Sequence, residues 1–429
     1  MRQVSPMQES TSPALLDQPP SLALVLPTGR AEAERRIAGV SAVARVLIAA
    51  FRAGIGRAWV VLDAPGGLAA AADDDLRRAG CAMQVEWLVR DDAKAQIRNS
   101  GEAVLALSCA LLPAPAALQR VMRATAPTAL GREGRPAALS LSARAAGPDL
   151  IEGLEAAAAG AAWIEADPGE IIALSPAWAA TRRIVRGTGK PSDGVVSRWI
   201  NRPISQSIST VLLAAPGVRP SQITALTAVI GIAMFGFLVL GGALGLCIGG
   251  VLFQLASVID GVDGEIARAA FRSSAAGAVA DSAVDMITNL AFVLGVTIGL
   301  YRVEGPIYGV IGVADVAAFS LGLAILAVLA RRRGGEFDLI KNHYDARIRS
   351  GVPRRIFETL RDMTSRDFFA LLFAVLAATG WSRAIPWVFA VGAVVWLVLI
   401  GCALPAFISP VQTGPARPRA PAAPGARDG

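Results

Sequence analysis

Four aspartates lie in one short stretch, DGVDGEIARAAFRSSAAGAVADSAVD, which runs from Asp260 to Asp285. The stretch directly follows 40 residues, 220–259, that contain no charged side chain. A carboxylate beside or within lipid is costly, so an acidic group there usually binds an ion, a proton or a substrate. The stretch is therefore the first candidate for a functional site.

The spacing of the four aspartates predicts a single cluster. Asp260 and Asp263 are three residues apart and Asp281 and Asp285 are four apart, so each pair shares one face of a helix. The first pair ends one apolar segment and the second pair begins the next, so neighbouring helices can direct all four to one point. Such carboxylates repel one another unless cations neutralise them, and ligands that are all oxygen favour Mg²⁺ or Mn²⁺. A site that holds such cations suits phosphoryl transfer.

Other residues of the stretch fit a substrate that contains a diphosphate. Gly264 and Gly277 leave room for a phosphate or a neighbouring helix to approach closely. Arg268 can pair with a diphosphate in bidentate fashion. Ser273 and Ser274 can donate hydrogen bonds to a phosphate or a base.

With these residues in view, the stretch resembles the signature of the CDP-alcohol phosphatidyltransferase family, D-x2-D-G-x2-A-R-x8-G-x3-D-x3-D. It matches all eight fixed positions, which are Asp260, Asp263, Gly264, Ala267, Arg268, Gly277, Asp281 and Asp285. The similarity extends over about residues 197–408. One departure precedes the first apolar segment, where many members have Pro-Asn-x-x-Thr. This chain keeps Pro220 and Thr224 there but has Ser221 in place of the asparagine.

The resemblance implies a membrane enzyme of six transmembrane helices that releases CMP from a CDP-alcohol. An acceptor hydroxyl would attack the phosphorus distal to cytidine, in phospholipid or polyol-phosphodiester synthesis. The resemblance also implies that the four aspartates hold two divalent cations, Mg²⁺ or Mn²⁺, and that Asp285 is the base that takes the acceptor's proton. The residues that it implies for CDP binding are Gly264, Ala267, Arg268, Ser274, Gly277 and Thr224.

The donor and the acceptor stay open at this point. The donor is CDP-diacylglycerol or a CDP-polyol, and the acceptor is a polyol or a polyol phosphate. A phosphorylated acceptor needs cationic groups, for which Lys341, Arg361 and Arg366 are candidates, although the same three fit topology or headgroup charges. Membrane lipids are expected partners, and a homodimer is expected because members of the family are commonly homodimers.

Long apolar segments place the aspartates at a membrane. A helical span needs about 20 apolar residues, and the sequence predicts six spans, of which the fifth is the shortest: 223–240, 243–259, 277–300, 307–330, 368–381 and 385–407. Residues 331–366 hold ten Lys and Arg residues, and the segment before the first span is also basic. We therefore expect both termini, the soluble part and the aspartates on the cytoplasmic side of the inner membrane.

The segment before the first span predicts a helix that lies in the membrane interface. Trp199, Ile200, Ile204, Ile208 and Leu212 fall near one helical face. The alternative is an ordinary soluble helix packed on the first domain.

The first 190 residues predict an α/β domain. Buried strands are expected at 22–27, 57–63, 83–88 and 103–108, with Ala-rich helices such as 40–53 between them, which favours a doubly wound parallel sheet. The layout resembles the sugar-nucleotidyltransferase fold. Some archaeal and bacterial proteins fuse such a domain, an inositol-phosphate cytidylyltransferase, ahead of a di-inositol-phosphate synthase of the membrane family. Residues 190–205 resemble the junction in those fusions.

The catalytic residues of that first domain are replaced here. Active relatives have a Gly-rich run with a basic residue after the first strand, whereas this loop has one glycine, Gly29, followed by Arg30. The fourth strand, which should end in a metal-binding aspartate, ends in Ser108 and Cys109. Without that carboxylate, nucleotidyl transfer with Mg²⁺ loses its anchor. We expect a degenerate domain that binds a ligand or braces the membrane part.

The expected organisation has five parts: a disordered N-terminus at 1–20, the nucleotidyltransferase-like domain at 21–190, a linker and interfacial helix at 191–215, the transmembrane domain at 216–409, and a disordered tail at 410–429. The net charge of +7 comes from basic residues beside apolar spans, so we expect no nucleic-acid partner. Four scattered cysteines indicate neither a zinc site nor a disulfide framework.

The alternative function is a transporter or an ion-binding membrane protein, because carboxylates within a membrane also mark ion paths. Asp315, inside the fourth predicted span, would suit that function. The glycine and arginine pattern around the four aspartates favours the enzyme, because a proton path has no use for a pocket of diphosphate size.

Overall fold

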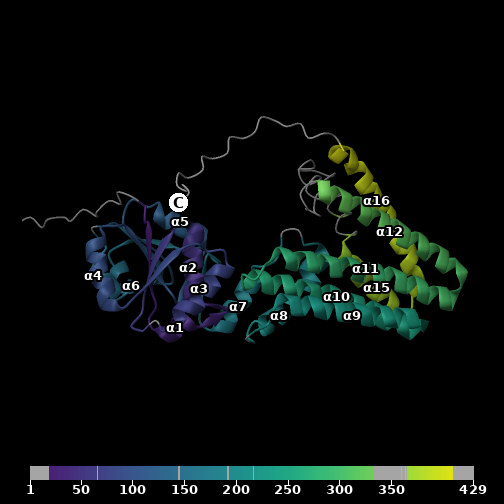
Figure 1. The fold of residues 1–429 in the computed structure, drawn as a ribbon, viewed down its shortest axis with the longest axis horizontal. Helices are drawn as coiled ribbons and strands as arrows, with labels where there is room; N and C mark the ends of the chain where they lie inside the picture. The colour runs from purple at the N-terminus through teal and green to yellow at the C-terminus, as the bar shows by residue number, and fades with distance from the viewer. Residues whose placement is uncertain are drawn as a thin grey trace, which may run out of the picture. The chain divides into compact units, whose positions relative to one another are not determined.

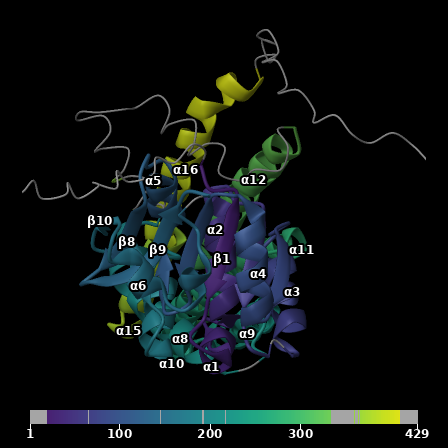
Figure 2. The ribbon, with the colours of Figure 1, turned by 90° about the vertical axis from the view of Figure 1, so that its left-hand side faces the viewer.

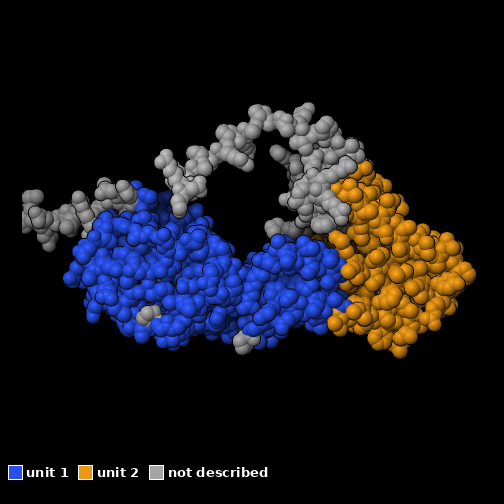
Figure 3. All heavy atoms as spheres, viewed as in Figure 1, with its two compact units in different colours: residues 1–193, 197–228, 256–285 blue, residues 194–196, 229–255, 286–429 orange. Residues whose placement is uncertain are grey.

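The structure is a computed structural model that describes residues 19–64, 66–143, 145–190, 193–215, 217–332, 359, 363 and 365–408. The chain forms two compact units (Figure 3). Unit 1 comprises residues 1–193, 197–228 and 256–285, and unit 2 comprises residues 194–196, 229–255 and 286–429. Unit 1 therefore joins the α/β part to the ends of the helices that carry the four aspartates.

The α/β part of unit 1 contains a seven-stranded sheet in the order β10-β8-β9-β6-β1-β4-β5, part of which is seen in Figure 2. The four predicted strands are present as β1 (Leu22–Leu26), β4 (Arg57–Val61), β5 (Gln84–Leu88) and β6 (Val104–Ser108). The other strands of the sheet are β8 (Thr128–Arg132), β9 (Arg135–Leu141) and β10 (Ala162–Glu165).

The sheet is mixed, so the expectation of a parallel sheet was wrong for β9. This strand runs antiparallel to both β6 and β8. The reason is the two-residue turn between β8 and β9, in which Glu133 and Gly134 both have positive φ, 54° and 77°. Such a turn matches the twist of a hairpin and reverses the chain, so β9 has to pair antiparallel with β8.

Helices cover both faces of the sheet because both faces of its central strand are apolar. Ala23 and Val25 of β1 belong to the core under α2 (Ala42–Ala53), α3 (Leu68–Arg78) and α5 (Pro115–Met122). Leu22 and Leu24 belong to the core under α4 (Arg90–Ser100) and α6 (Leu154–Ala158) (Figure 1). This layering confirms the α/β class of the first part. The smaller elements are α1 (Arg30–Glu34), β2 (Arg36–Ile37), β3 (Val40–Ser41), β7 (Leu111–Pro113), η1 (Pro148–Ile151), β11 (Ile171–Ala173) and α7 (Ala177–Arg186).

The helix before the first apolar span buries its polar side and exposes its apolar side. Ser205 and Ser209 of α8 (Arg202–Leu212) are buried, whereas Ile204 and Val211 are exposed. In the preceding η2 (Ser197–Asn201), Trp199 is 74% exposed. An apolar outer face is typical of a helix in a membrane interface, which favours that interpretation over an ordinary soluble helix.

The C-terminal part is helical. Its helices are α9 (Pro220–Leu240), α10 (Gly242–Ala269), α11 (Ala275–Glu304), α12 (Pro306–Arg332), α15 (Arg366–Ala378), η3 (Ser382–Ala384) and α16 (Ile385–Ile408). Five segments among the described residues are long and apolar enough to cross a membrane: α9, α10, α11, Pro306–Leu329 and Ser382–Leu404. The fifth predicted span corresponds to α15, whose 13 residues reach only about 20 Å. The count of six spans stays a prediction.

Small residues let the helices of unit 2 approach closely. A Cβ on Gly299 of α11 would lie 2.3 Å from the carbonyl oxygen of Leu238 in α9, and a Cβ on Gly249 of α10 would lie 2.4 Å from the Leu238 side chain. Phe253 and Phe292 stack beside these contacts with ring centroids 4.0 Å apart. In a membrane the hydrophobic effect does not drive helices together, and close packing of this kind holds α9, α10 and α11 in contact instead.

Candidate active site

A cavity of about 860 Å³ lies in unit 1, next to the aspartates. Eight of the residues predicted for the site line it: Thr224, Asp263, Gly264, Ala267, Arg268, Ser274, Gly277 and Asp281. They come from the start of α9, the end of α10, the loop 270–274 and the start of α11. The helix ends bring six of the eight fixed residues of the signature and Thr224 together around one space large enough for a nucleotide, whereas Asp260 and Asp285 are not among the residues that line it.

Two of the aspartates, from different helices, touch. The carboxyl groups of Asp263 on α10 and Asp281 on α11 lie within hydrogen-bonding range of each other, and Asp260 is close enough to repel both. Thr224 Oγ1 also donates to Asp263 Oδ2 at 2.6 Å. Asp260 and Asp285 each stand about one helical turn further from the loop and make interactions of their own. Of the four aspartates that we expected to meet, Asp263 and Asp281 therefore face each other.

The donor set fits hard cations, although the described residues contain no group of three or more His, Cys, Asp or Glu side chains arranged to hold a metal ion. Two carboxylates in contact, with a third one nearby, are stable when a cation neutralises them. Oxygen ligands of this kind suit Mg²⁺ or Mn²⁺.

Gly264 makes room for an arginine. A Cβ at this position would lie 2.9 Å from Nη1 of Arg268, so the guanidinium lies directly over the glycine. Arg268 Nε donates to the carbonyl oxygen of Thr188 at 3.0 Å, which fixes the plane of the group at the cavity wall. Gly264 thus makes room for the Arg268 guanidinium, the group that we expected to bind the diphosphate.

Ser274 has a structural role that the sequence analysis did not assign. Its Oγ accepts a hydrogen bond from the N–H of Gly277 at 3.0 Å, which is the N-cap interaction of α11. A Cβ on Gly277 would lie 2.9 Å from that same Oγ. The serine and the glycine therefore start the helix that carries Asp281, and both also line the cavity.

Four basic residues that the sequence analysis missed line the same cavity: Arg78, Lys190, Arg219 and Arg272. Arg272 lies within the signature stretch and Arg219 directly precedes Pro220, so their positions were a usable signal. Arg78 comes from α3, far away in the sequence, and nothing in its surroundings indicated this role. Burial, followed by the charges of Arg78 and Arg36, lowers the pKa of Arg272. The excess of cations suits an anionic ligand.

A buried glutamate ties α10 to α8. Glu265 is fully buried and accepts hydrogen bonds from Ser205 Oγ at 2.7 Å, Ser209 Oγ at 2.6 Å and Arg202 Nη1 at 2.9 Å. Arg202 also pairs with both carboxylate oxygens of Asp193, at 2.9 and 3.0 Å. A buried charge needs partners of this kind. Glu265 occupies a variable position of the signature, so its spacing carried no signal.

The remaining candidates lie elsewhere. Lys341 and Arg361 are outside the described residues, and Arg366 is half-buried at the first residue of α15, where it makes interactions. Asp315 is 4% exposed in α12 and borders a cavity of about 10 Å³ in unit 2, beside Thr297 and Phe292.

The loop after β1 binds one of the chain's own carboxylates. The backbone N–H of Thr28 donates to Glu32 Oε2 at 2.7 Å, and its hydroxyl donates to the same atom at 3.0 Å. At the end of β6, Ser108 Oγ accepts from the N–H of Ala110 at 3.1 Å. Burial, with the charge of Glu32 as a second cause, raises the pKa of the Cys109 thiol. The Glu32 carboxylate therefore accepts the hydrogen bond from the Thr28 N–H that a phosphate oxygen could otherwise accept.

Comparisons with known proteins agree with this geometry. The family model described as CDP-alcohol phosphatidyltransferase matches residues 218–398. Proteins named "Bifunctional IPC transferase and DIPP synthase" are similar to the chain: that of Thermococcus kodakarensis is 38% identical over 133 residues, that of Aquifex aeolicus 35% over 130, and that of Rubrobacter xylanophilus 38% over 145. These matches cover 31%, 30% and 33% of this chain and 28%, 28% and 30% of the relatives.

The chain thus matches less than a third of each relative's length. The family match covers the helices α9, α10 and α11, which contribute the signature residues to the cavity, and most of the candidate spans. The C-terminal part of this multi-pass membrane protein is therefore a CDP-alcohol phosphatidyltransferase domain.

Proposed function

We propose that the protein transfers a phospho-alcohol group from a CDP-alcohol to an acceptor hydroxyl and releases CMP. The observation that carries this proposal is the contact between Asp263 and Asp281, on helices α10 and α11, at a cavity lined by six of the eight signature residues. Four of the eight lining residues from the prediction are fixed positions of the signature between these two aspartates: Gly264, Ala267, Arg268 and Gly277. A transporter would need no such nucleotide-sized space.

In this mechanism the chain's residues bind and orient the donor. Arg268, held over Gly264, pairs with the diphosphate, and the neighbouring Arg272 adds positive charge at the cavity wall. Thr224 fixes the orientation of the Asp263 carboxylate by its hydrogen bond. Asp285 takes the proton of the acceptor hydroxyl as the oxygen bonds to the distal phosphorus, and the bond from that phosphorus to the CMP oxygen breaks.

Two divalent cations, Mg²⁺ or Mn²⁺, would be held by Asp260, Asp263, Asp281 and Asp285. When bound, they neutralise phosphate charge and the charge that develops on the leaving oxygen. The contact between the Asp263 and Asp281 carboxyl groups supports this assignment, because a cation removes their repulsion.

The substrates that fit are CDP-diacylglycerol or a CDP-polyol as donor, and a polyol or a polyol phosphate as acceptor. The resemblance of the layout to fusions with a di-inositol-phosphate synthase supports the polyol-phosphate class, and the basic residues at the cavity are compatible with either class. We further propose that the aspartates and the α/β part face the cytoplasm across the inner membrane, as the ten basic residues at 331–366 favour. We also propose that the protein is a homodimer.

The test is CMP release by purified full-length protein in detergent, with each donor and acceptor class in turn and with Mn²⁺ present. We expect release from one donor, loss of release in Asp285→Asn, and unchanged release in the control Asp92→Asn, an exposed aspartate on α4. Equal release in wild type and Asp285→Asn would remove Asp285 as the base. No release with any donor would refute the proposed reaction.

We also propose that the α/β part does not transfer nucleotides. The capture of the Thr28 N–H by Glu32 and the absence of an aspartate at the end of β6 support this. The test uses full-length Asp285→Asn protein, so that the membrane site is silent, and measures pyrophosphate release from CTP with polyol phosphates. Turnover above the level without enzyme would overturn the proposal.

A further inference from the structure

The helix α10 ends in an unusual way. Its last turn closes with the N–H of Arg272 bonded to the carbonyl oxygen of Ala267 at 2.7 Å, the pattern of a Schellman C-cap. The residue that must then adopt a left-handed conformation is usually glycine, but here it is Phe271, with φ of 54°. A bulky residue keeps such a conformation only where its surroundings enforce it.

The α/β part supplies those surroundings. The ring of Phe271 packs against the core of that part that lies under α2. Two arginines of α2 lie over the ring, Arg45 at 5.5 Å and Arg52 at 4.8 Å from its centroid. The turn between β2 and β3 also lies against the helix end, because a Cβ on Gly39 would meet the Ala270 Cβ at 3.5 Å.

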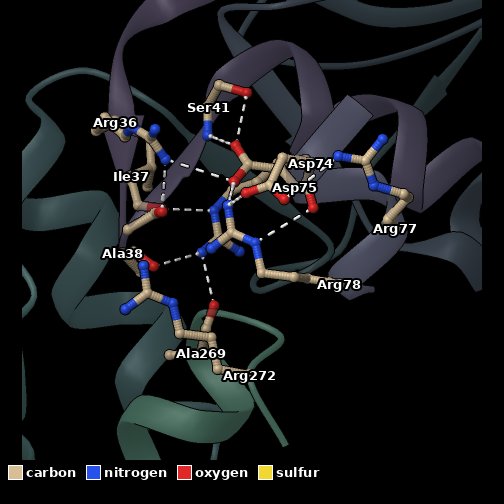
Figure 4. Close-up of polar contacts among 12 residues, drawn as sticks. Arg36, Ile37, Ala38, Ser41, Asp74, Asp75, Arg77, Arg78, Ala269 and Arg272 are labelled. Atoms are coloured by element: carbon tan, nitrogen blue, oxygen red, sulfur yellow. Dashed lines mark hydrogen bonds and ion pairs between the residues drawn. The ribbon is translucent and has the colours of Figure 1, made fainter. Parts of the chain in front are cut away.

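Arg45 joins the two sides directly. Its side chain is buried and donates from Nε to the carbonyl oxygen of Ile37 at 2.7 Å. Its Nη2 donates to the carbonyl oxygens of Ala38 at 3.2 Å and Ala269 at 2.7 Å, the bonds drawn at these residues in Figure 4. Burial lowers the pKa of Arg45 to about 9, so the guanidinium keeps its charge at neutral pH. A cation at the C-terminus of a helix is favourable for the helix dipole.

We propose that Arg45 is a positioning residue of the transferase, which fastens the end of α10 and the loop 270–274 to the α/β part. The α/β part would thus act on the reaction by holding the loop that joins the two aspartate-bearing helices. All the residues involved belong to unit 1. The inference rests on the proposed function.

The loop matters because it links both halves of the site. Its residues Arg272, Ser273 and Ser274 line the cavity, and Ser274 caps α11. Asp263 stands less than two turns before Ala269, the residue that Arg45 holds. Loosening this end therefore changes how the carboxylates of the two helices face each other, without removing any group that touches the substrate.

The experiment compares full-length Arg45→Gln, Arg45→Lys and the control Arg98→Gln, an exposed arginine on α4. Initial rates of CMP release give kcat and the donor KM, and hydrogen exchange measured by mass spectrometry reports on residues 266–278. We expect kcat of Arg45→Gln to fall by roughly 10- to 100-fold, as for small misplacements of reacting groups, with faster exchange in residues 266–278. Lysine keeps the charge but donates from a single nitrogen, so Arg45→Lys should recover part of both losses.

A second variant covers the case in which Arg45→Gln does not fold. Phe271→Gly suits the left-handed backbone, removes the ring that packs against the core and the two arginines, and changes no residue of the α/β core itself. It should speed exchange in the loop and lower kcat in the same direction as Arg45→Gln.

Two outcomes would overturn the inference. One is a folded Arg45→Gln with kcat within about twofold of wild type, well short of the loss expected from a misplaced site. The other is unchanged exchange in the loop for both Arg45→Gln and Phe271→Gly. If wild type released no CMP at all, the proposed function would fail, while the exchange data would still show whether Arg45 fastens the loop.

Discussion

The ion pair between Arg202 and Glu265 leads to a quantitative prediction. In Arg202→Met, Glu265 stays fully buried on α10 and keeps only the two serine hydroxyls as partners. Leaving one charge of a buried pair without its counter-ion costs about 3–5 kcal/mol. We expect the free energy of unfolding to fall by about this amount. Asp193, the other partner of Arg202, adds less because it still accepts from the N–H of Lys190.

The second half of this prediction is a double-mutant cycle. Replacing both members of a buried pair with apolar residues of similar volume is often neutral, because no charge is left buried. Glu265→Met in the Arg202→Met background should therefore recover most of the lost stability, which corresponds to a coupling energy of about 3 kcal/mol or more between the two positions. Unfolding by urea in detergent micelles, followed by tryptophan fluorescence, measures each corner of the cycle.

The control for the cycle is Arg182→Met, an exposed arginine of the neighbouring α7, for which we expect less than about 0.5 kcal/mol. The reasoning is refuted if Arg202→Met is as stable as wild type. It is also refuted if the double variant is no more stable than Arg202→Met, because the loss would then come from the arginine alone.

Three further predictions concern the site and its linker. Thr224→Val removes the 2.6 Å hydrogen bond to the Asp263 carboxylate, worth about 1.5–3 kcal/mol, so kcat/KM for CMP release should fall by roughly 10- to 100-fold. Gly264→Ala places a Cβ 2.9 Å from Arg268 Nη1, so the guanidinium must shift and the donor KM should rise. Burial alone would raise the pKa of Asp193, but its partners outweigh this and hold the pKa below the usual 3.8. Its ion pair is therefore complete at neutral pH and is lost as the pH falls below that value, so the stability difference between wild type and Asp193→Asn should narrow in acid.

Each of these has its own check. Gly236→Ala is the control for the glycine, because a Cβ there meets nothing within 4 Å, and an equal effect of both changes would exclude the arginine as the cause. For Thr224→Val, a rate equal to wild type would mean that the hydrogen bond to Asp263 does not orient it for the reaction. A stability difference at Asp193 that stays constant down to pH 3 would mean that this carboxylate keeps an ordinary pKa.

Much of the fold could be predicted because it depends on local patterns. The strands β1, β4, β5 and β6 are apolar runs bounded by polar turns, and such runs are visible in any short window. The antiparallel direction of β9 was not predicted, because it depends on the turn at Glu133 and Gly134. A positive φ at a residue other than glycine, such as Glu133, is hard to recognise in a sequence. The bounds of α15 also differ from those of the fifth predicted span, because apolarity alone does not determine where a helix begins.

The sequence alone was enough to identify the family of the C-terminal part: eight residues match the fixed positions of the signature, each pair of aspartates shares a helix face at a spacing of three or four, and a charge-free block precedes them. What holds those residues in place could be seen only in the folded chain. Arg45, Phe271 and Glu265 act through contacts with partners 56 to 224 positions away, or through a left-handed backbone that glycine would normally adopt. Periodicity reports which side chains share a face of one element, because it is local, whereas the meeting of two elements depends on the packing of the whole unit.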